Sequence, residues 1–239
     1  MKNSYYIKET LSTNNLLWEL SRQQNLEEGF IVYTDFQTGG KGQAGNSWES
    51  ETGENLLFSL LLHPVHIDIN EHFLLSQIVS IGIKNVLDKY TGDIRIKWPN
   101  DIYWKDEKII GILIENSIQN NHIKTSIAGI GVNVNQLEFK SAPNAVSLKR
   151  ITGQEYDRSG LLESFRSSIL DVYCNWDKTQ IKNSYMGGLY RKDDFYPYKT
   201  NDRVFEARII DIHEDGKMEL ETKKGEVLGF YFKEVQFVL

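Results

Sequence analysis

The sequence predicts an α+β protein in which a mixed β-sheet packs with helices and a small β-barrel-like domain follows. Strand patterns outnumber helical patterns and come in runs, which disfavours a doubly wound sheet. After about residue 190, short strand patterns separated by Gly-containing turns replace the helices. The 239 residues suffice for two domains, which we expect at 1–192 and 193–239.

The larger domain is predicted to begin with a helix over about residues 14–24, where leucines recur at helical spacing. The apolar residues between 73 and 86 keep a 3.6-residue period and predict a long helix that ends near Gly92. A third helix should open at Asp157 or Ser159. With these helices on one face, the sheet is expected to contain strands at Phe30–Tyr33, Leu56–His63, Ile94–Trp98, Ile109–Glu115 and Thr125–Asn133.

The smaller domain is predicted to contain only strands. Three short β-rich segments stand at Arg203–Ile212, Lys217–Thr222 and Val227–Phe232, and each is separated from the next by a charged, Gly-containing turn. This spacing is typical of a small antiparallel β domain.

Composition and charge exclude several classes of protein. The net charge of −6, from 27 Lys+Arg against 33 Asp+Glu, disfavours a protein that mainly grips a phosphate backbone. Cys174 is the single cysteine, so no intramolecular disulfide can form, and a reducing cytoplasm is the expected location. The amino-terminal residues lack the apolar region of a signal peptide. The apolar run Leu56–Leu62 is too short to cross a bilayer.

A glycine-rich loop is the first candidate for a binding element. Residues 40–45 spell G-x-G-x-x-G, but a polar turn and a strand follow where a dinucleotide-binding fingerprint requires a helix. The triplets HRD and DFG, which a kinase needs, are absent. What remains is a loop whose backbone N–H groups and Lys41 can surround an anion. Gln37 before it and Trp48 after it disfavour a loose surface loop, because a large aromatic ring is costly to leave in water.

A second cluster combines two cations and a carboxylate. Lys97 and Asp101 lie within the run KWPND, where Pro99 should end a strand and place Asp101 on a loop. A charged turn and a second strand should bring Lys108 back beside them. Lysines that offset phosphate charge, with a carboxylate that orients a lysine or holds Mg²⁺, suit phosphate chemistry.

Taken together, the motifs resemble those of the biotin protein ligase family over about residues 10–135. The matching segments are Ser12-Thr13-Asn14, the loop 37–48, KWPND at 97–101, K-x-x-G-I-L at 108–113 and GIGVN at 129–133. The resemblance implies a biotin/lipoate ligase type of catalytic domain and an SH3-like carboxyl-terminal domain. One departure concerns the loop, which in the family usually reads G-R-G-R and here has Gln43 in place of the second basic residue.

The family's reaction has two steps in one site. Biotin and MgATP form biotinyl-5′-AMP and pyrophosphate, and a lysine of a biotin carboxyl carrier domain, such as that of acetyl-CoA carboxylase, then displaces AMP. Some members carry an amino-terminal DNA-binding domain and some form homodimers. This chain begins almost directly at the catalytic part, so neither repressor activity nor DNA binding is expected, and no membrane partner is implied.

The resemblance also assigns site residues. The catalytic residues are expected to be Lys108, Lys97 and Asp101, with Asp101 and Asn100 handling either Mg²⁺ or the incoming lysine. The expected biotin contacts are Ser12, Thr13, Asn14, Gln37, Gly40, Lys41, Gly42, Gln43, Lys108 and Gly111. The expected ATP or adenylate contacts are Lys41, Trp48, Lys97, Asn100 and Asn133.

Three alternatives remain open at this stage. A lipoate ligase or octanoyl transferase shares the catalytic architecture, and transfer of labelled biotin or lipoate separates it. A non-enzymatic biotin or nucleotide sensor is disfavoured by Lys97, Asp101 and Lys108, and ATP-dependent pyrophosphate release would exclude it. A DNA-binding regulator is disfavoured by the acidic balance, and a gel shift tests it.

Overall fold

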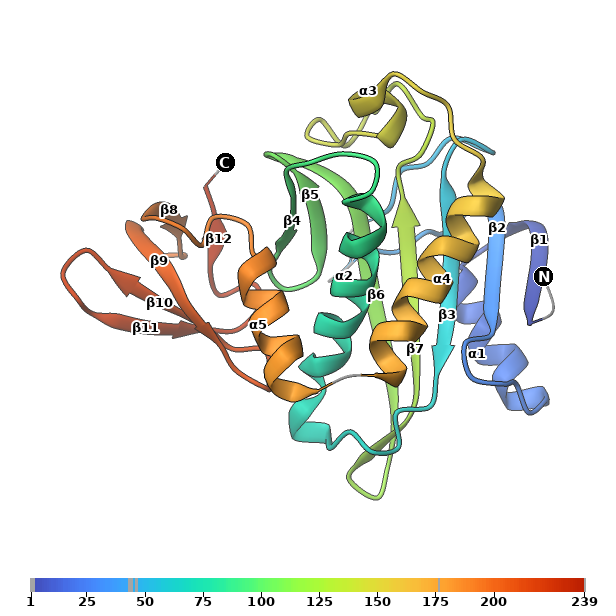
Figure 1. Ribbon diagram of the computed structural model, residues 1–239, viewed down its shortest axis with the longest axis horizontal. Helices are drawn as coiled ribbons and strands as arrows, with labels where there is room; N and C mark the ends of the chain where they lie inside the picture. Colours follow the sequence, from blue (N-terminus) through green and yellow to red (C-terminus); the bar gives the residue numbers. More distant parts are fainter. Residues whose placement is uncertain (1–2, 43–44, 46, 176, 239) are drawn as a thin grey trace.

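A seven-stranded mixed sheet forms the centre of the larger domain in the computed structural model, which describes residues 3–42, 45, 47–175 and 177–238 (Figure 1). The strand order is β1-β2-β3-β7-β6-β5-β4. β1 and β2 pair in parallel, whereas the other neighbours pair antiparallel. The strands are β1 Ser4–Thr10, β2 Ile31–Gln37, β3 Leu56–Leu62, β4 Ile94–Lys97, β5 Asp101–Trp104, β6 Glu107–Gln119 and β7 His122–Val132.

Helices lie on both faces of this sheet. The long helices α2 (Phe73–Leu87) and α4 (Arg158–Cys174) pack side by side on one face, and α5 (Lys178–Gly188) lies next to α2 (Figure 1). On the opposite face, Leu17 of α1 (Thr13–Gln23) packs on Val32 and other buried residues of β2, β3 and β7. The expectation of helices on one face is therefore wrong for α1. The described residues also contain short helices at Ile69–Glu71 and Leu148–Thr152 (α3).

The carboxyl-terminal segment forms a separate five-stranded antiparallel sheet in the order β11-β10-β9-β8-β12. Its strands are β8 Tyr196–Lys199, β9 Val204–Ile212, β10 Met218–Thr222, β11 Val227–Phe230 and β12 Gln236–Phe237. The helix-free β character predicted for this part is confirmed. The exact domain boundary at 192/193 stays a prediction.

Most elements of the larger domain lie where the patterns place them, with shifts at their ends. The helix α2 stops at Leu87, before the predicted end near Gly92, because Asp88 and the following turn close it. The side chain of Asp157 caps α4 by accepting hydrogen bonds from the backbone N–H groups of Ser159 and Gly160. Asp101 opens β5 rather than lying on a loop. None of the helices that the structure describes is both long enough and apolar enough to cross a membrane.

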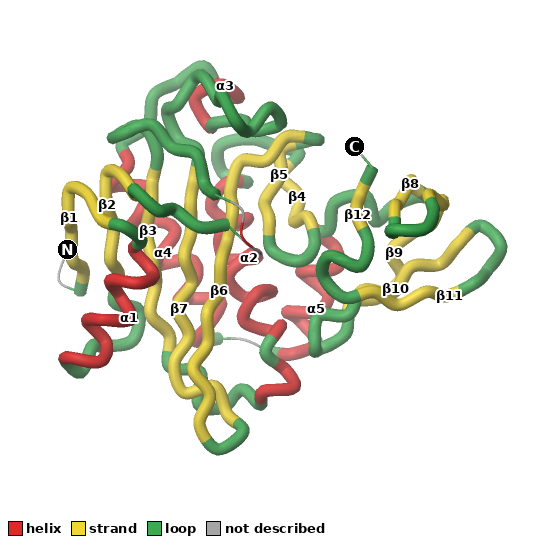
Figure 2. Tube along the Cα trace, turned by 180° about the vertical axis from the view of Figure 1, so that it is seen from behind, coloured by secondary structure: helices red, strands yellow, loops and turns green. Residues whose placement is uncertain are grey.

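The face of the sheet that carries α1 also carries the connection from β2 to β3 (Figure 2). The connection from β2 to β3, which contains the glycine-rich loop, crosses the sheet on this side (Figure 2). The amino end of α1, this loop and the ends of β4, β5 and β6 therefore meet on one face.

Candidate active site

Glycines on the central strands form the floor of the site. Gly111 of β6 and Gly131 of β7 lie directly under the indole of Trp48, and a Cβ atom at either position would come within 2.6 or 2.5 Å of that ring. Gly129 stands in the same way against the side chain of Asn14. Only residues without a side chain let the loop and α1 approach the sheet so closely.

A polar network lies at the amino end of α1. The Oε1 atom of Gln37 accepts hydrogen bonds from the Thr13 backbone N–H at 2.8 Å and from its hydroxyl at 3.1 Å. The buried Ser59 hydroxyl of β3 lies 2.7 Å from Thr13 Oγ1 and 2.6 Å from Asn14 Oδ1. Asn14 Nδ2 donates to the Glu115 carboxylate at 2.8 Å. Ser12 precedes α1 but its side chain makes no capping hydrogen bond. The result is an ordered lining of hydroxyl and amide groups, with the Glu115 carboxylate behind Asn14, that suits a polar uncharged group.

Two lysines and an aspartate meet at the end of the β4–β5–β6 hairpins. Strand register pairs Lys97 with Asp101 and Tyr103 with Lys108. Lys108 Nζ forms an ion pair with Asp101 Oδ2 at 2.7 Å, and Lys97 Nζ donates to the Tyr103 hydroxyl at 2.9 Å. The prediction that the hairpin returns Lys108 to this cluster is confirmed.

Lys97 is half-buried and lies against two aromatic rings. Its Nζ lies 4.5 Å from the centre of the Tyr103 ring and 5.3 Å from that of Phe237 of β12. Burial lowers the pKa of Lys97 from its ordinary value to about 8; Asp101 opposes this shift, and the positive charges of Lys108 and Arg191 add to it. A site that receives anions would restore the charged form of this amine.

The loop places Trp48 over the cluster. The Trp48 backbone N–H donates to the Gly40 carbonyl at 3.0 Å, and an isolated antiparallel β-bridge joins Lys41 to Ser47. The Lys108 Nζ lies 5.7 Å from the centre of the Trp48 indole. The indole Nε1 is buried and has no hydrogen-bond partner among the residues that the structure describes. An unpaired buried donor costs about 1–3 kcal/mol, so a ligand acceptor beside the indole would stabilise this loop position.

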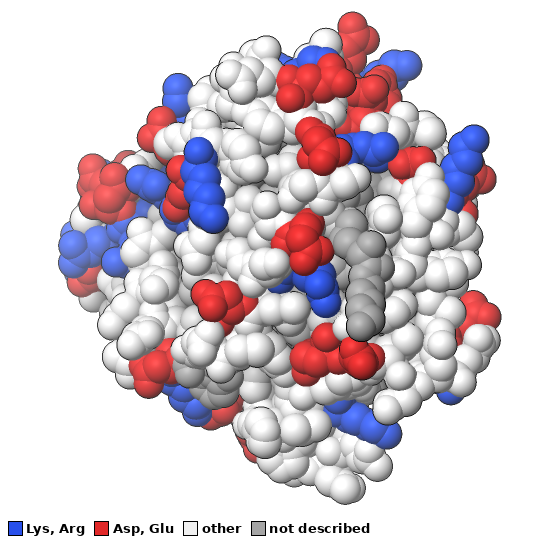
Figure 3. All heavy atoms as spheres, turned by 45° about the vertical axis from the view of Figure 1, so that its right-hand side comes forward, with Lys and Arg blue, Asp and Glu red and all other residues white. Residues whose placement is uncertain are grey.

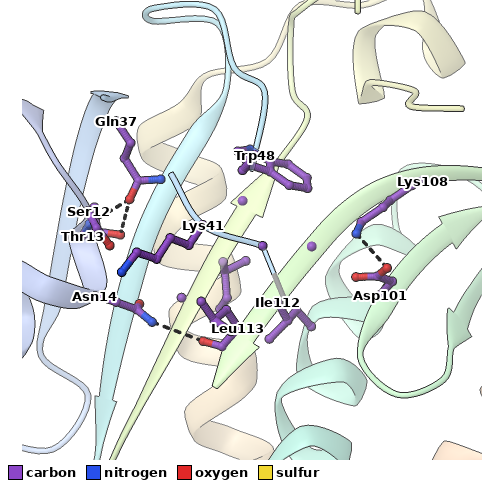
Figure 4. Close-up of a pocket in the computed structure, with 15 residues that line it drawn as sticks. Ser12, Thr13, Asn14, Gln37, Lys41, Trp48, Asp101, Lys108, Ile112 and Leu113 are labelled. Atoms are coloured by element: carbon purple, nitrogen blue, oxygen red, sulfur yellow. Dashed lines mark hydrogen bonds and ion pairs between the residues drawn. The ribbon is translucent and has the colours of Figure 1, made fainter. Parts of the chain in front are cut away.

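Two cavities meet at this point, and Figure 4 shows the first of them. The first has the polar network at one end and Lys108 at the other, and is lined by Ser12, Thr13, Asn14, Gln37, Lys41, Gly42, Trp48, Asp101, Lys108 and Gly111, among others. The second extends towards the small domain and is lined by residues that include Lys97, Asn100, Asp101, Lys108, Phe232 and Phe237. Trp48, Asp101 and Lys108 line both cavities, so the two are parts of one site.

The remaining predicted residues have less direct positions. Asn100 is buried and its Nδ2 donates to the Ile112 carbonyl at 2.8 Å. Asn133 lies beneath Lys108, donating to its carbonyl at 3.4 Å, and its buried Oδ1 has no partner among the described residues. Gly40 lies against the Gln37 side chain, while Gln43 lies outside the described residues.

The sequence patterns did not indicate Ser59, Glu115 or Tyr103. Ser59 stands inside an apolar strand and Glu115 on a polar stretch, so neither has a spacing that suggests a site. Tyr103 could have been found from the alternation of β5, which places it opposite Lys108.

Charged side chains of both signs are interspersed with uncharged residues on the face of the protein shown in Figure 3. Within the described part of the chain, no three His, Cys, Asp or Glu side chains gather in a group that could hold a metal ion. The site thus offers fixed amines and one carboxylate, Asp101, a set that suits a metal brought in by substrate phosphates.

Comparison with known proteins agrees with this geometry. The model of the biotin/lipoate A/B protein ligase family matches residues 6–134. The bifunctional ligase/repressor BirA of Bacillus subtilis is 30% identical over 228 residues, which cover 90% of this chain and 68% of that protein. The human biotin–protein ligase is 32% identical over 134 residues, covering 54% of this chain and 18% of that protein.

Solved structures give the same result over the full length. The biotin protein ligase of Aquifex aeolicus in complex with biotin and ATP superimposes with a TM-score of 0.79 and 25% identity, covering 100% of both chains. The family match, the curated relatives and this structural agreement show that the chain belongs to the biotin/lipoate A/B protein ligase family, as a ligase whose relatives are biotin protein ligases.

Proposed function

We propose that this chain activates biotin with MgATP and transfers the biotinyl group to a lysine of a biotin carboxyl carrier domain. The observation that carries the proposal is the junction of two cavities at Lys108, one with an end lined by hydroxyl and amide groups and the other with the half-buried Lys97. The first cavity suits the ureido ring of biotin, and the second cavity suits a nucleoside triphosphate.

In the first step, a carboxylate oxygen of biotin attacks the α-phosphorus of MgATP, and the bond to the β-phosphate breaks to release pyrophosphate. Two anions must meet, so fixed positive charge at their junction lowers the barrier. Lys108 fills this role, contacting both the carboxylate and the α-phosphate, and Lys97 supports the phosphates. Before substrates arrive, Asp101 holds the Lys108 amine at 2.7 Å.

In the second step, the amine of the carrier lysine attacks the carbonyl carbon of the mixed anhydride. The bond to the phosphate oxygen breaks, AMP leaves, and the amine gives up a proton. Asp101 lines both cavities and Asn100 lines the second, so the incoming amine is proposed to arrive beside them. Enclosure by Trp48 and the glycine loop shields the anhydride from water.

The carrier domain is proposed to dock on the open side of β6. β5 pairs only with residues 107–110 of this strand, so residues 113–119 have no neighbouring strand on that side within the described chain. Addition of a strand to such an edge is a common way to bind a β-rich partner. Photo-crosslinks from position 117 to the carrier would support this site, whereas crosslinks confined to residues 193–239 would exclude it.

The experiment that tests the function measures pyrophosphate release from MgATP in the presence of biotin or of lipoate. We expect release with biotin and none above background with lipoate, because the network of Thr13, Asn14 and Gln37 pairs with a polar head group. Pyrophosphate release with lipoate and MgATP but not with biotin and MgATP would assign the chain to the lipoate branch of the family. No release with either acid would exclude an acid-activating ligase.

A further inference from the structure

One carboxylate, that of Glu49, joins the glycine loop to a second loop far along the chain. Glu49 Oε1 accepts a hydrogen bond from the backbone N–H of Lys140 at 2.6 Å. Its Oε2 accepts from the backbone N–H of Ser141 at 2.7 Å and from the Ser141 hydroxyl at 2.5 Å. Glu49 directly follows Trp48 and is separated from Lys140 by 91 residues, so the contact is tertiary.

These hydrogen bonds are made to an ionised group. Burial raises the pKa of the Glu49 carboxyl, but hydrogen bonds from the Ser141 hydroxyl and from the backbone of residues 140–142 outweigh burial and lower that pKa. The carboxylate is therefore charged at neutral pH, and its hydrogen bonds are of the stronger, charge-assisted kind. Successive backbone N–H groups that surround an anion form a concave binding element, filled here by the chain's own side chain.

The loop that receives Glu49 leads directly to the two lysines. The Asn144 carbonyl accepts a hydrogen bond from the Lys108 backbone N–H at 2.7 Å, and Val146 backbone N–H donates to the Lys108 carbonyl at 3.0 Å. Asn144 Nδ2 donates to the Tyr103 hydroxyl at 3.4 Å, and this hydroxyl accepts from Lys97. Residues 140–146 thus connect Glu49 with the backbone of one lysine and the side chain of the other.

On the other side, Glu49 restrains the wall of the site. The neighbouring indole of Trp48 lies over Gly111 and Gly131 and faces the amine of Lys108 (Figure 4). The next tether along the chain is the hydrogen bond from Glu51 backbone N–H to Gln136 at 2.9 Å. Without the Glu49 contact, the stretch that carries Trp48 would keep the packing of the indole on Gly111 and Gly131 and the hydrogen bond of Glu51, but would lose its link to residues 140–146.

We propose that Glu49 is a positioning residue whose carboxylate latches the glycine loop to residues 140–146 and so keeps Trp48 and Lys108 aligned around the acyl-adenylate. The inference rests on the proposed function, since it concerns how firmly that site holds its intermediate. Losing the latch should speed the escape of biotinyl-5′-AMP while all the lysines remain in place.

The test compares Glu49→Gln with Glu51→Gln. The first change replaces one carboxylate oxygen by an N–H₂ group that would face backbone donors, whereas the exposed Glu51 carboxylate accepts no hydrogen bond among the described residues. We expect Glu49→Gln to release preformed biotinyl-5′-AMP about tenfold faster, the factor that loss of a hydrogen bond to a charged group brings. Glu51→Gln should match the wild type, and Ser141→Ala, which removes one donor, should fall between the two.

A second measurement does not depend on activity. Backbone hydrogen exchange of the ligand-free chain should be faster over residues 138–146 in Glu49→Gln and unchanged in Glu51→Gln. Unchanged exchange in Glu49→Gln would overturn the latch, and faster exchange with unchanged release would overturn the positioning role. If Glu49→Gln does not fold, the same two measurements on Ser141→Ala decide: unchanged exchange would overturn the latch, and faster exchange with unchanged release would overturn the positioning role. A wild-type chain that forms no biotinyl-5′-AMP would contradict the proposed function instead, and the exchange measurement would still decide the latch.

Discussion

At the scale of single residues, the position of Lys108 follows from strand register. Lys108 is opposite Tyr103 across the β5–β6 turn, and Asp101 at the start of β5 reaches its amine. This ion pair is half-buried, with side chains 28% and 29% exposed, and because water still reaches both groups it adds little to stability. The pair is better explained as orientation of the amine than as support for the fold.

Replacing Lys108 therefore tests chemistry rather than folding. Lys108→Ala should lower biotin-dependent pyrophosphate release by about 10²–10³, the loss typical of removing one group that stabilises transition-state charge. Its thermal unfolding should stay close to that of the wild type. The control Lys105→Ala removes an exposed lysine from the same hairpin and should keep activity. Unaltered pyrophosphate release in Lys108→Ala would remove this residue from the mechanism.

Lys97 predicts a dependence on pH. Burial lowers its pKa to about 8, so the amine is charged below pH 8 and becomes neutral as the pH rises through this value. If the charge serves phosphate binding, kcat/KM for ATP should fall above pH 8, because this parameter reports the free enzyme. Lys97→Arg keeps its charge and should lose this alkaline decline. The same decline in both proteins would show that another group titrates.

At the scale of elements, close approach between loop and sheet depends on the glycines of β6 and β7. Gly131→Ala would place a Cβ atom 2.5 Å from the Trp48 ring and displace the loop. We expect the KM for ATP to rise about tenfold, as loss of a positioned contact worth about 1.4 kcal/mol brings. Gly92→Ala, where nothing lies within 4 Å of the added atom, is the control. Equal KM values in the two variants would mean that Trp48 does not wall the nucleotide site.

The segment 38–55 should respond to substrates as one element. Its glycines permit movement, and biotin with MgATP should draw it over the intermediate. Limited proteolysis should cleave it more slowly in the presence of both substrates than in their absence. Equal cleavage rates under the two conditions would mean that the segment does not close.

Local sequence patterns were enough to predict most helices and strands, but not the exposed strand β1 or the face of the sheet on which a helix packs. The alternation and runs at Leu56–Leu62 and Ile94–Lys97 gave strands within one residue of those observed. β1 was missed because its exposed, mixed polar pattern resembles no buried strand. The helix α1 was predicted, but its face of the sheet depends on whether Leu17 or its neighbours pack on Val32, which only the assembled sheet decides.

The candidate site was predictable where chemistry concentrates in short motifs. Lys97, Asp101 and Lys108 lie within twelve positions of one another, and a hairpin brings such residues together by local geometry. Ser59, Glu115 and the Glu49 latch depend on contacts between distant segments. Their hydrogen bonds join segments that come together only in the folded chain, so no local sequence pattern predicts them.

At the scale of the whole molecule, the small domain lines the second cavity of the site, where we propose that the nucleotide binds. Phe237 of β12 covers Lys97, and Trp98 Nε1 donates to the Gly216 carbonyl of the β9–β10 turn at 3.0 Å. The sheet that carries the lysines and the sheet that covers them therefore meet at the KWPND motif. This arrangement places residues of a β domain late in the sequence in contact with Lys97 and Trp98.

The most direct test of the central claim is the mass of a carrier domain after incubation with this chain, biotin and MgATP. The account predicts the addition of one biotinyl group to a single carrier lysine, and no addition when ATP is omitted or when Lys108→Ala replaces the wild type. An unmodified carrier with the wild-type chain, or equal modification by Lys108→Ala, would contradict it.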